Sequence, residues 1–238
     1  MPPIGFSTGA LARGDVQLGL QMLRATNANA VELSALRQNE LPILVGLLDD
    51  LDLRQFEYVS VHAPSALDPE YENIALELLA QIQNREWPII VHPDAMHNPR
   101  AWDRFGQLLY LENMDIRKPV GQTASDLARL FADLPQASLC FDIGHARQVD
   151  PTMSEAAQIV LQFRDKLRQL HVSEVNAQSK HDPLSLEAVM AFRRVAKLIA
   201  HDVPIILESR VDEPDIQREM DNAVRALDTT IALAIAGD

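Results

Sequence analysis

Residues 138–146 of the chain read SLCFDIGHA. An apolar run of strand length ends there at Asp142, and His145 follows shortly after it. Apolar runs elsewhere in the chain end in the same manner, with a histidine, an aspartate or a glutamate. Six successive runs share this feature and end at His62, His92, Glu112, Asp142, His171 and Glu208. Parallel strands of one barrel would bring these side chains together at its C-terminal end, where (β/α)₈ barrels carry their active sites.

The whole chain alternates short β-branched or apolar runs with longer amphipathic stretches, which is typical of repeated β-strand–α-helix units. The predicted strands are Ile4–Ser7, Ala30–Leu33, Tyr58–His62, Ile89–His92, Leu108–Glu112, Ser138–Asp142, Leu167–Val172 and Ile205–Glu208. Between them, apolar residues recur at the three- and four-residue spacing of helices. The last helix is predicted over about 214–236, with Gly237 as a natural stop just past it.

This alternation predicts the α/β class and a single (β/α)₈ TIM barrel domain over residues 1–238. A doubly wound open sheet is the alternative, and it normally shows a glycine-rich phosphate-binding turn after its first strand. Residues 5–9, GFSTG, do not supply that pattern. The sequence therefore favours the closed barrel.

The composition is that of a soluble globular protein, with 47% hydrophobic and 23% charged residues. The one cysteine, Cys140, rules out an internal disulfide and fits a reducing cytoplasm. The first residues have neither the basic start nor the apolar core of a signal peptide. No apolar run approaches the roughly 18–20 residues that span a bilayer. We therefore expect a cytoplasmic protein that does not enter membranes.

The formal net charge is −13, with a pI near 4.9. Proteins that bind long stretches of nucleic acid neutralise phosphates with Lys and Arg, so this balance argues against nucleic acid as the partner. It leaves room for a local basic cleft. We expect a small-molecule partner, and the sequence leaves open whether the chain forms a homo-oligomer.

Histidines gather at the predicted strand ends. Of the seven in the chain, four lie in or just beyond a strand end, and His181 follows in the next loop. Imidazoles and carboxylates that converge in this way are ligands for Zn²⁺, Mn²⁺ and similar ions. A structural role for every one of these polar residues is improbable, because buried carboxylates without partners are costly. We therefore predict a divalent metal site. Its histidines favour Zn, Mn or Co, with Fe and Mg left open.

At these residues the chain resembles the xylose-isomerase-like barrel superfamily, which contains sugar isomerases and epimerases and also zinc apurinic-site endonucleases. The segment 138–146 is the most specific part of the resemblance. In the epimerases a Glu–Asp–His–Glu set holds one metal, which implies Glu112, Asp142, His171 and Glu208 as ligands here. The resemblance also implies that Glu112 and Glu208 exchange a proton with a carbon next to a carbonyl, and that His145 contacts a substrate hydroxyl.

The endonuclease branch uses further histidines to hold a cluster of metals around a phosphodiester. The resemblance implies His62 and His92 as ligands of one added ion, and His145 and His181 as ligands of another. The chain departs from that branch at Ser179, where the family has Asp, and Asp182 is the candidate substitute. The turn after His62 also lacks the bulky residues with which that branch enters DNA.

Several basic residues follow the predicted strands and indicate an anionic substrate, such as a sugar phosphate or a phosphodiester. They are Arg37, Arg117, Lys118, Arg147, Lys180 and Arg210. Glu32, at the end of the second strand, is expected either to bind sugar hydroxyls or to pair with Arg37.

Three functions remain open, and the sequence favours them in the following order. A metal-dependent isomerase or epimerase of a small, phosphorylated or unphosphorylated sugar or related keto compound is favoured by the acidic pI, the compact length and the complete four-ligand set. A di- or trinuclear zinc phosphodiesterase is favoured by the four additional histidines. The third is a barrel that binds a small ligand without turnover, since fold alone does not fix function.

Overall fold

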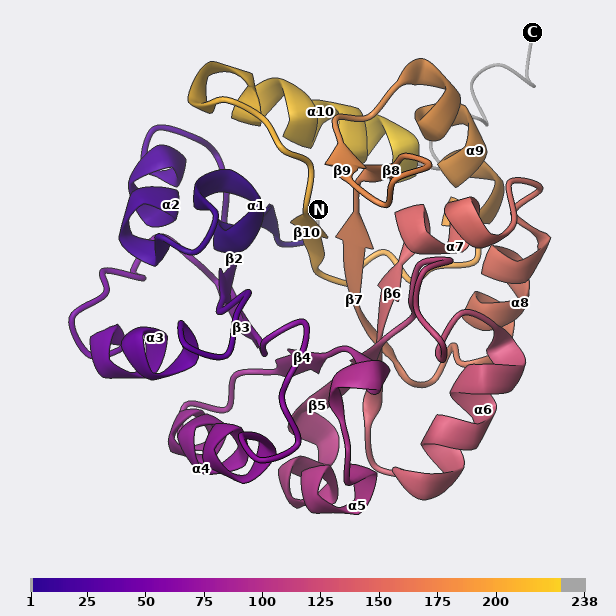
Figure 1. Ribbon diagram of the computed structural model, residues 1–238. Coiled ribbons are helices and arrows are strands. Elements are labelled where there is room, and N and C mark those ends of the chain that lie inside the picture. The colour runs from indigo at the N-terminus through magenta and orange to yellow at the C-terminus, as the bar shows by residue number, and fades with distance from the viewer. Residues whose placement is uncertain (1, 228–238) are drawn as a thin grey trace, which may run out of the picture.

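The computed structural model of the protein describes residues 2–227 (Figure 1). Its core is a closed barrel of eight strands in the order β1-β10-β7-β6-β5-β4-β3-β2, and every neighbouring pair in the barrel is parallel. These strands are β1 Ile4–Ser7, β2 Ala30–Ser34, β3 Tyr58–His62, β4 Ile89–Val91, β5 Leu109–Glu112, β6 Ser138–Asp142, β7 Leu167–Val172 and β10 Ile205–Leu207. The predicted (β/α)₈ barrel is confirmed, and no predicted strand end is off by more than one residue.

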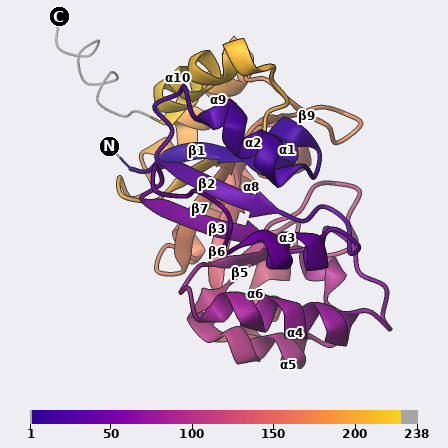
Figure 2. The ribbon, with the colours of Figure 1, turned by 90° about the vertical axis from the view of Figure 1, so that its left-hand side faces the viewer.

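Helices surround the barrel on its outside (Figures 1 and 2). The α-helices are α1 Thr8–Ala12, α2 Val16–Leu23, α3 Leu41–Leu47, α4 Glu72–Gln83, α5 Pro99–Trp102, α6 Ala124–Asp133, α7 Ile143–Val149, α8 Ser154–Gln162, α9 Leu186–Ala196 and α10 Ile216–Leu227. Short 3₁₀ turns cover Pro93–Ala95, Asp103–Leu108 and Glu213–Asp215. The last helix begins as predicted, and its expected continuation to 236 and the stop at Gly237 lie outside the described residues. Within 2–227, no helix has both the length and the apolar character needed to cross a lipid bilayer.

The alternation of side chains along each strand separates two environments. On β5 and β6, Leu111 and Phe141 belong to the main apolar core, which fills the space between the strands and the helices. Tyr110 and Cys140 point the other way and form a small separate cluster with Ile90 inside the barrel. The next inward-facing residues on these two strands are Glu112 and Asp142, with which the strands end.

Barrel closure depends on a glycine in β1. A Cβ placed on Gly5 would lie 1.7 Å from the carbonyl oxygen of Ala30 on β2. No side chain fits there, so the two strands can approach only with glycine at this position.

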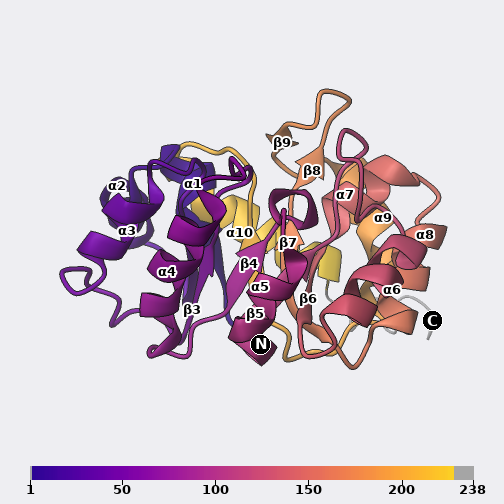
Figure 3. The same ribbon diagram turned by 60° about the horizontal axis from the view of Figure 1, so that its bottom comes forward.

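One short sheet lies outside the barrel and was not expected from the sequence. Strands β8 Glu174–Val175 and β9 His181–Asp182 form an antiparallel hairpin in the connection after β7. Figure 3 shows it projecting from the end of the barrel at which β6 and β7 finish. The hairpin carries His181 to the site described next.

Candidate metal centre

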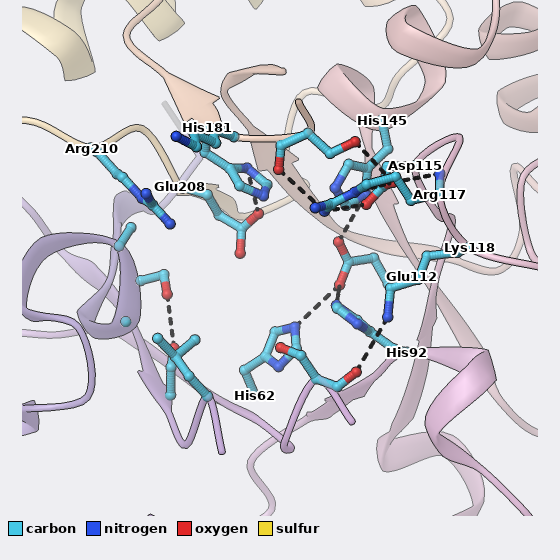
Figure 4. A pocket seen from close by; sticks show the side chains of 18 of the residues that line it. His62, His92, Glu112, Asp115, Arg117, Lys118, His145, His181, Glu208 and Arg210 are labelled. Carbon is cyan, nitrogen blue, oxygen red and sulfur yellow. Dashed lines mark hydrogen bonds and ion pairs between the residues drawn. The ribbon is translucent and has the colours of Figure 1, made fainter. Parts of the chain in front are cut away.

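A cavity of about 660 Å³ opens at the C-terminal ends of the barrel strands (Figure 4). Its wall includes Ser7 and Ser34 at the ends of β1 and β2, whose hydroxyl oxygens lie 2.8 Å apart. Its floor is formed by histidines and carboxylates from β3 to β10, and its rim carries basic residues. The cavity thus lies at the C-terminal end of the barrel, where the sequence predicted the functional site.

Glu112 lies at the middle of this floor and is 1% exposed. Its Oε2 lies 3.2 Å from Nε2 of both His62 and His92. Its Oε1 lies 3.3 Å from Nδ1 of His145 and 3.4 Å from Nδ1 of His171. One carboxylate at the end of β5 is therefore surrounded by imidazoles from β3, from the residue after β4, from β7 and from the first turn of α7.

The potential ligand atoms fall into three overlapping donor sets, in each of which the atoms lie within 4.8 Å of one another. We call them the first set (His62, His92, Glu112), the central set (Glu112, Asp142, His171, Glu208) and the third set (Asp142, His145, His181). Glu112 belongs to the first and central sets, and Asp142 to the central and third sets. A fourth combination, Glu32 with His62 and Glu208, meets the same distance limit and shares His62 with the first set and Glu208 with the central set.

Buried atoms without partners indicate that the central set fits a cation. Among the described residues, Oδ2 of Asp142 and Nδ1 of His171 are buried and make no hydrogen bond. Buried polar atoms in folded proteins nearly always have a partner, so such atoms need an explanation. A divalent ion between them would supply the missing partner for both.

The orientation of the histidine rings supports the same reading for the first set. Nδ1 of His62 lies 2.6 Å from the carbonyl oxygen of Ala63 and must donate to it. In a neutral His62, Nε2 then presents its lone pair to Oε2 of Glu112, 3.2 Å away. Two hydrogen-bond acceptors at this distance need either a cation between them or a second proton on the ring. His145 is held in a similar way, with Nδ1 2.9 Å from the carbonyl oxygen of Asn113.

In the absence of a cation, the carboxylates around these rings favour protonation of the imidazoles. Burial lowers the pKa of His62, but the hydrogen bond to Glu112 and the charges of Glu32 and Glu112 outweigh it and raise the pKa to about 9. Burial likewise opposes protonation of His145, yet the charge of Asp142 and the hydrogen bond to Glu112 raise its pKa to about 10. The site therefore favours bound positive charge, which protons or a divalent cation can provide.

The third set differs from the predicted one. Asp182 does not replace the missing aspartate, because it belongs to none of the donor sets, and its Oδ2 accepts a hydrogen bond from the side-chain amide of Asn176. Ser179 lines the cavity, and its hydroxyl donates to Oδ1 of Asp115 at 3.0 Å. Asp142 completes the third set instead, together with His145 at the start of α7 and His181 on the hairpin.

The predicted substrate residues divide into two groups. Lys118 and Arg210 line the cavity, as do Arg117 and Lys180. In the part of the chain that the structure describes, neither Arg37 nor Arg147 lines the cavity. The Arg37 guanidinium pairs with Glu40, and that of Arg147 pairs with Glu174 and Glu187.

Glu32 is likewise not placed to touch a substrate. It is fully buried beneath the cavity, and it pairs with His171 instead of Arg37. Sequence reasoning also missed Gln169, which contacts both Glu32 and His171. Its position two residues before His171 on β7 was the available signal, because residues two apart on a strand share a face.

The geometry defines the class of the protein at the level of fold: a (β/α)₈ barrel with overlapping sets of residues at its C-terminal end that could hold a metal ion. Solved structures of xylose-isomerase-like barrels share this fold. The IolI protein with a bound zinc atom matches with a TM-score of 0.68 and 11% identity, over 94% of this chain and 98% of that chain. SacUVDE matches with a TM-score of 0.54 and 15% identity, over 89% and 83%.

A structure from Anabaena variabilis that is described as a sugar phosphate isomerase/epimerase matches with a TM-score of 0.55 and 15% identity, over 93% of this chain and 88% of that chain. No protein-family model and no curated protein sequence matches the chain. The expected resemblance to xylose-isomerase-like barrels is thus confirmed in the fold. At these sequence identities, structural similarity shows a shared fold and does not assign the activities of those proteins to this chain.

Proposed function

We propose that the protein is a metal-dependent phosphodiesterase whose centre holds two or three divalent ions. The observation that carries this proposal is the overlap of the donor sets, in which adjacent sets share Glu112 or Asp142. A shared carboxylate is the usual way in which a protein holds neighbouring ions a few ångströms apart for the displacement at an ester. The order of preference suggested by the sequence is thereby reversed.

Four histidines favour hydrolysis over isomerisation. A single-ion isomerase needs only the central set, and it has no use for His62, His92, His145 and His181 as ligands. All four rings nevertheless converge on the two carboxylates that the sets share. When bound, divalent ions would polarise the oxygens of a phosphoester and neutralise the charge that develops on them.

The basic rim supports an anionic substrate. Within residues 2–227, the side chains of Lys180 and Arg210 have no ion-pair partner, whereas Arg117 and Lys118 are engaged with Asp115 and Asp94. Arg210 and Lys118 lie on opposite sides of the cavity in Figure 4, so a bound anion would contact cations from more than one direction. The net charge of −13 favours a small phosphodiester over a long nucleic acid.

Metal content and hydrolysis of bis(p-nitrophenyl) phosphate test the proposal together. Protein purified without chelator or histidine tag should contain two or three Zn, Mn, Co or Fe ions per chain. It should cleave this diester or a member of a phosphodiester panel that includes an abasic oligonucleotide. His62→Ala and His92→Ala should each lose the activity and about one ion, while His201→Ala, outside the cavity wall, should keep both. One ion per chain, or full activity in both variants, would refute the proposal.

A metal-dependent isomerase or epimerase is the second candidate. Glu112 and Glu208 belong to the same central set, and two carboxylates beside one ion can act as the base and the acid of a proton transfer. The similarity to the zinc-containing IolI structure over nearly the whole of both chains also supports it. Solvent deuterium incorporated into a sugar or sugar phosphate, and lost in Glu208→Gln, would favour this candidate, whereas diester hydrolysis without deuterium exchange would favour the first.

A further inference from the structure

Glu32 is a buried carboxylate for which the proposed function provides no role. It lies on β2, is 0% exposed and is surrounded by side chains from the barrel interior. Its Oε2 accepts hydrogen bonds from the Ser60 hydroxyl at 3.2 Å and from Nε2 of Gln169 at 2.7 Å. The same oxygen lies 3.0 Å from Nε2 of His171, a member of the central set.

Gln169 has a fixed orientation in this network. Its Oε1 accepts a hydrogen bond from the hydroxyl of Tyr58 at 2.7 Å, so its Nε2 faces Glu32 and His171. Nε2 of His171 therefore lies between two groups of opposite character. The carboxylate of Glu32 only accepts a hydrogen bond, whereas the amide nitrogen of Gln169, 2.9 Å away, only donates one.

The two neighbours favour different tautomers of His171. Glu32 draws the ring proton to Nε2, and charge-assisted hydrogen bonds of this type are the stronger ones. Nδ1 then carries the lone pair, and it lies 3.4 Å from Oε1 of Glu112 and 3.6 Å from Oε1 of Glu208. Without the carboxylate, Gln169 would donate to Nε2 and leave the proton on Nδ1, where it blocks a ligand position of the central set.

We infer that Glu32 is a positioning residue, which holds His171 in the tautomer that offers Nδ1 to an ion in the central set. Its effect is exerted through His171 and not by contact with the substrate, in keeping with its burial beneath the cavity. The inference rests on the proposed metal centre. Loss of such a carboxylate partner typically lowers metal affinity about 10- to 100-fold.

Cobalt binding to the metal-free protein tests the inference. Affinity is measured by competition with a chelator and the coordination of the central ion by Co²⁺ absorption. Glu32→Gln should weaken the tightest Co²⁺ site about 10- to 100-fold. Ser60→Ala removes another donor to the same oxygen but does not touch His171, so it should bind Co²⁺ with near wild-type affinity. Tyr58→Phe, one contact further away, is a second control.

The outcomes separate the two proposals. Wild-type protein that binds no Co²⁺ would overturn the metal centre and this inference with it. Tight binding by the wild type and equal affinity in Glu32→Gln would overturn the inference alone. If Glu32→Gln does not fold, histidine ¹⁵N NMR of the zinc-loaded wild type decides: a protonated Nε2 on His171 supports the inference, and zinc bound to Nε2 overturns it.

Discussion

At the scale of single residues, two carboxylates connect the site, because each belongs to two of the donor sets. Glu112 and Asp142 are 1% and 0% exposed, so neither can turn to water when an ion leaves. Each of these carboxylates therefore stays within the site whether or not an ion is bound, and links the two donor sets to which it belongs.

Arg210 offers a residue-scale test of substrate binding. It lines the cavity beside Glu208 and has no ion-pair partner among the described residues (Figure 4). Arg210→Ala should raise KM for an anionic substrate about tenfold with little change in kcat, because a charge-assisted hydrogen bond contributes roughly 1.5–3 kcal/mol. Arg37→Ala is the matched control, since Arg37 pairs with Glu40 outside the cavity. Steady-state kinetics that show equal KM values for the two variants would contradict this role.

At the scale of elements, the hairpin β8–β9 determines whether the third set is complete. Its turn is held by Ser179, which adopts a left-handed conformation with φ of 50° and donates to Asp115. Gln148 on α7 donates to the carbonyl oxygen of Asn176 in the same turn. The position of His181 therefore depends on contacts of the hairpin with Asp115 and with α7.

Loosening the hairpin should remove one ion selectively. Asp115→Ala deletes the acceptor for Ser179 and for the Arg117 guanidinium, at a cost of about 1–3 kcal/mol in unfolding free energy. We expect the variant to lose the ion of the third set and to keep the others, as measured by metal analysis after dialysis. Asp52→Ala, which removes only an exposed ion pair, should change neither quantity. Retention of every ion by Asp115→Ala would show that the hairpin is held without this residue.

Barrel closure between β1 and β2 gives a second prediction at this scale. Gly5→Ala places a Cβ against the backbone of Ala30, which cannot move without separating the strands, and should cost at least about 3 kcal/mol. Gly46→Ala on α3 meets no atom within 4 Å and should be neutral or stabilising by up to about 1 kcal/mol. Urea unfolding of both variants measures the difference, and equal stabilities would contradict the proposed strand contact.

Much of the molecule was predictable from sequence because each strand is an apolar run that ends abruptly in a polar residue. That contrast located the strands and, through them, the side chains at the end of the barrel. The hairpin was not predictable, since its two strands are only two residues long each and its turn is held by contacts with Asp115 and α7. Arg37 and Arg147 were expected near the substrate because they follow strands, but sequence position does not fix where a long side chain points.

At the scale of the whole molecule, metal-free protein should respond to pH in a specific direction. The pKa values of His62 and His145, about 9 and about 10, lie above their ordinary value of 6.5. Raised values mean that protonation stabilises the fold; this contribution is complete below about pH 6.5 and is lost as the pH rises through 9 and 10. Thermal unfolding in EDTA should therefore show a Tm that falls from pH 7 to pH 10.

Zinc-loaded protein is the comparison for this experiment. A cation that replaces the ring protons removes the titration, so the Tm of the loaded protein should fall less over the same range. A metal-free Tm that stays constant or rises between pH 7 and pH 10 would contradict the assigned charge balance.

Cys140, the sole cysteine in the sequence, lies inside the barrel with Ile90 and Tyr110. It is 0% exposed, and burial raises the pKa of its thiol. An alkylating reagent can reach the sulfur only when the strands separate, so the rate of labelling reports how often the barrel opens. The labelling rate of Cys140 should therefore be higher after chelation than in the presence of zinc.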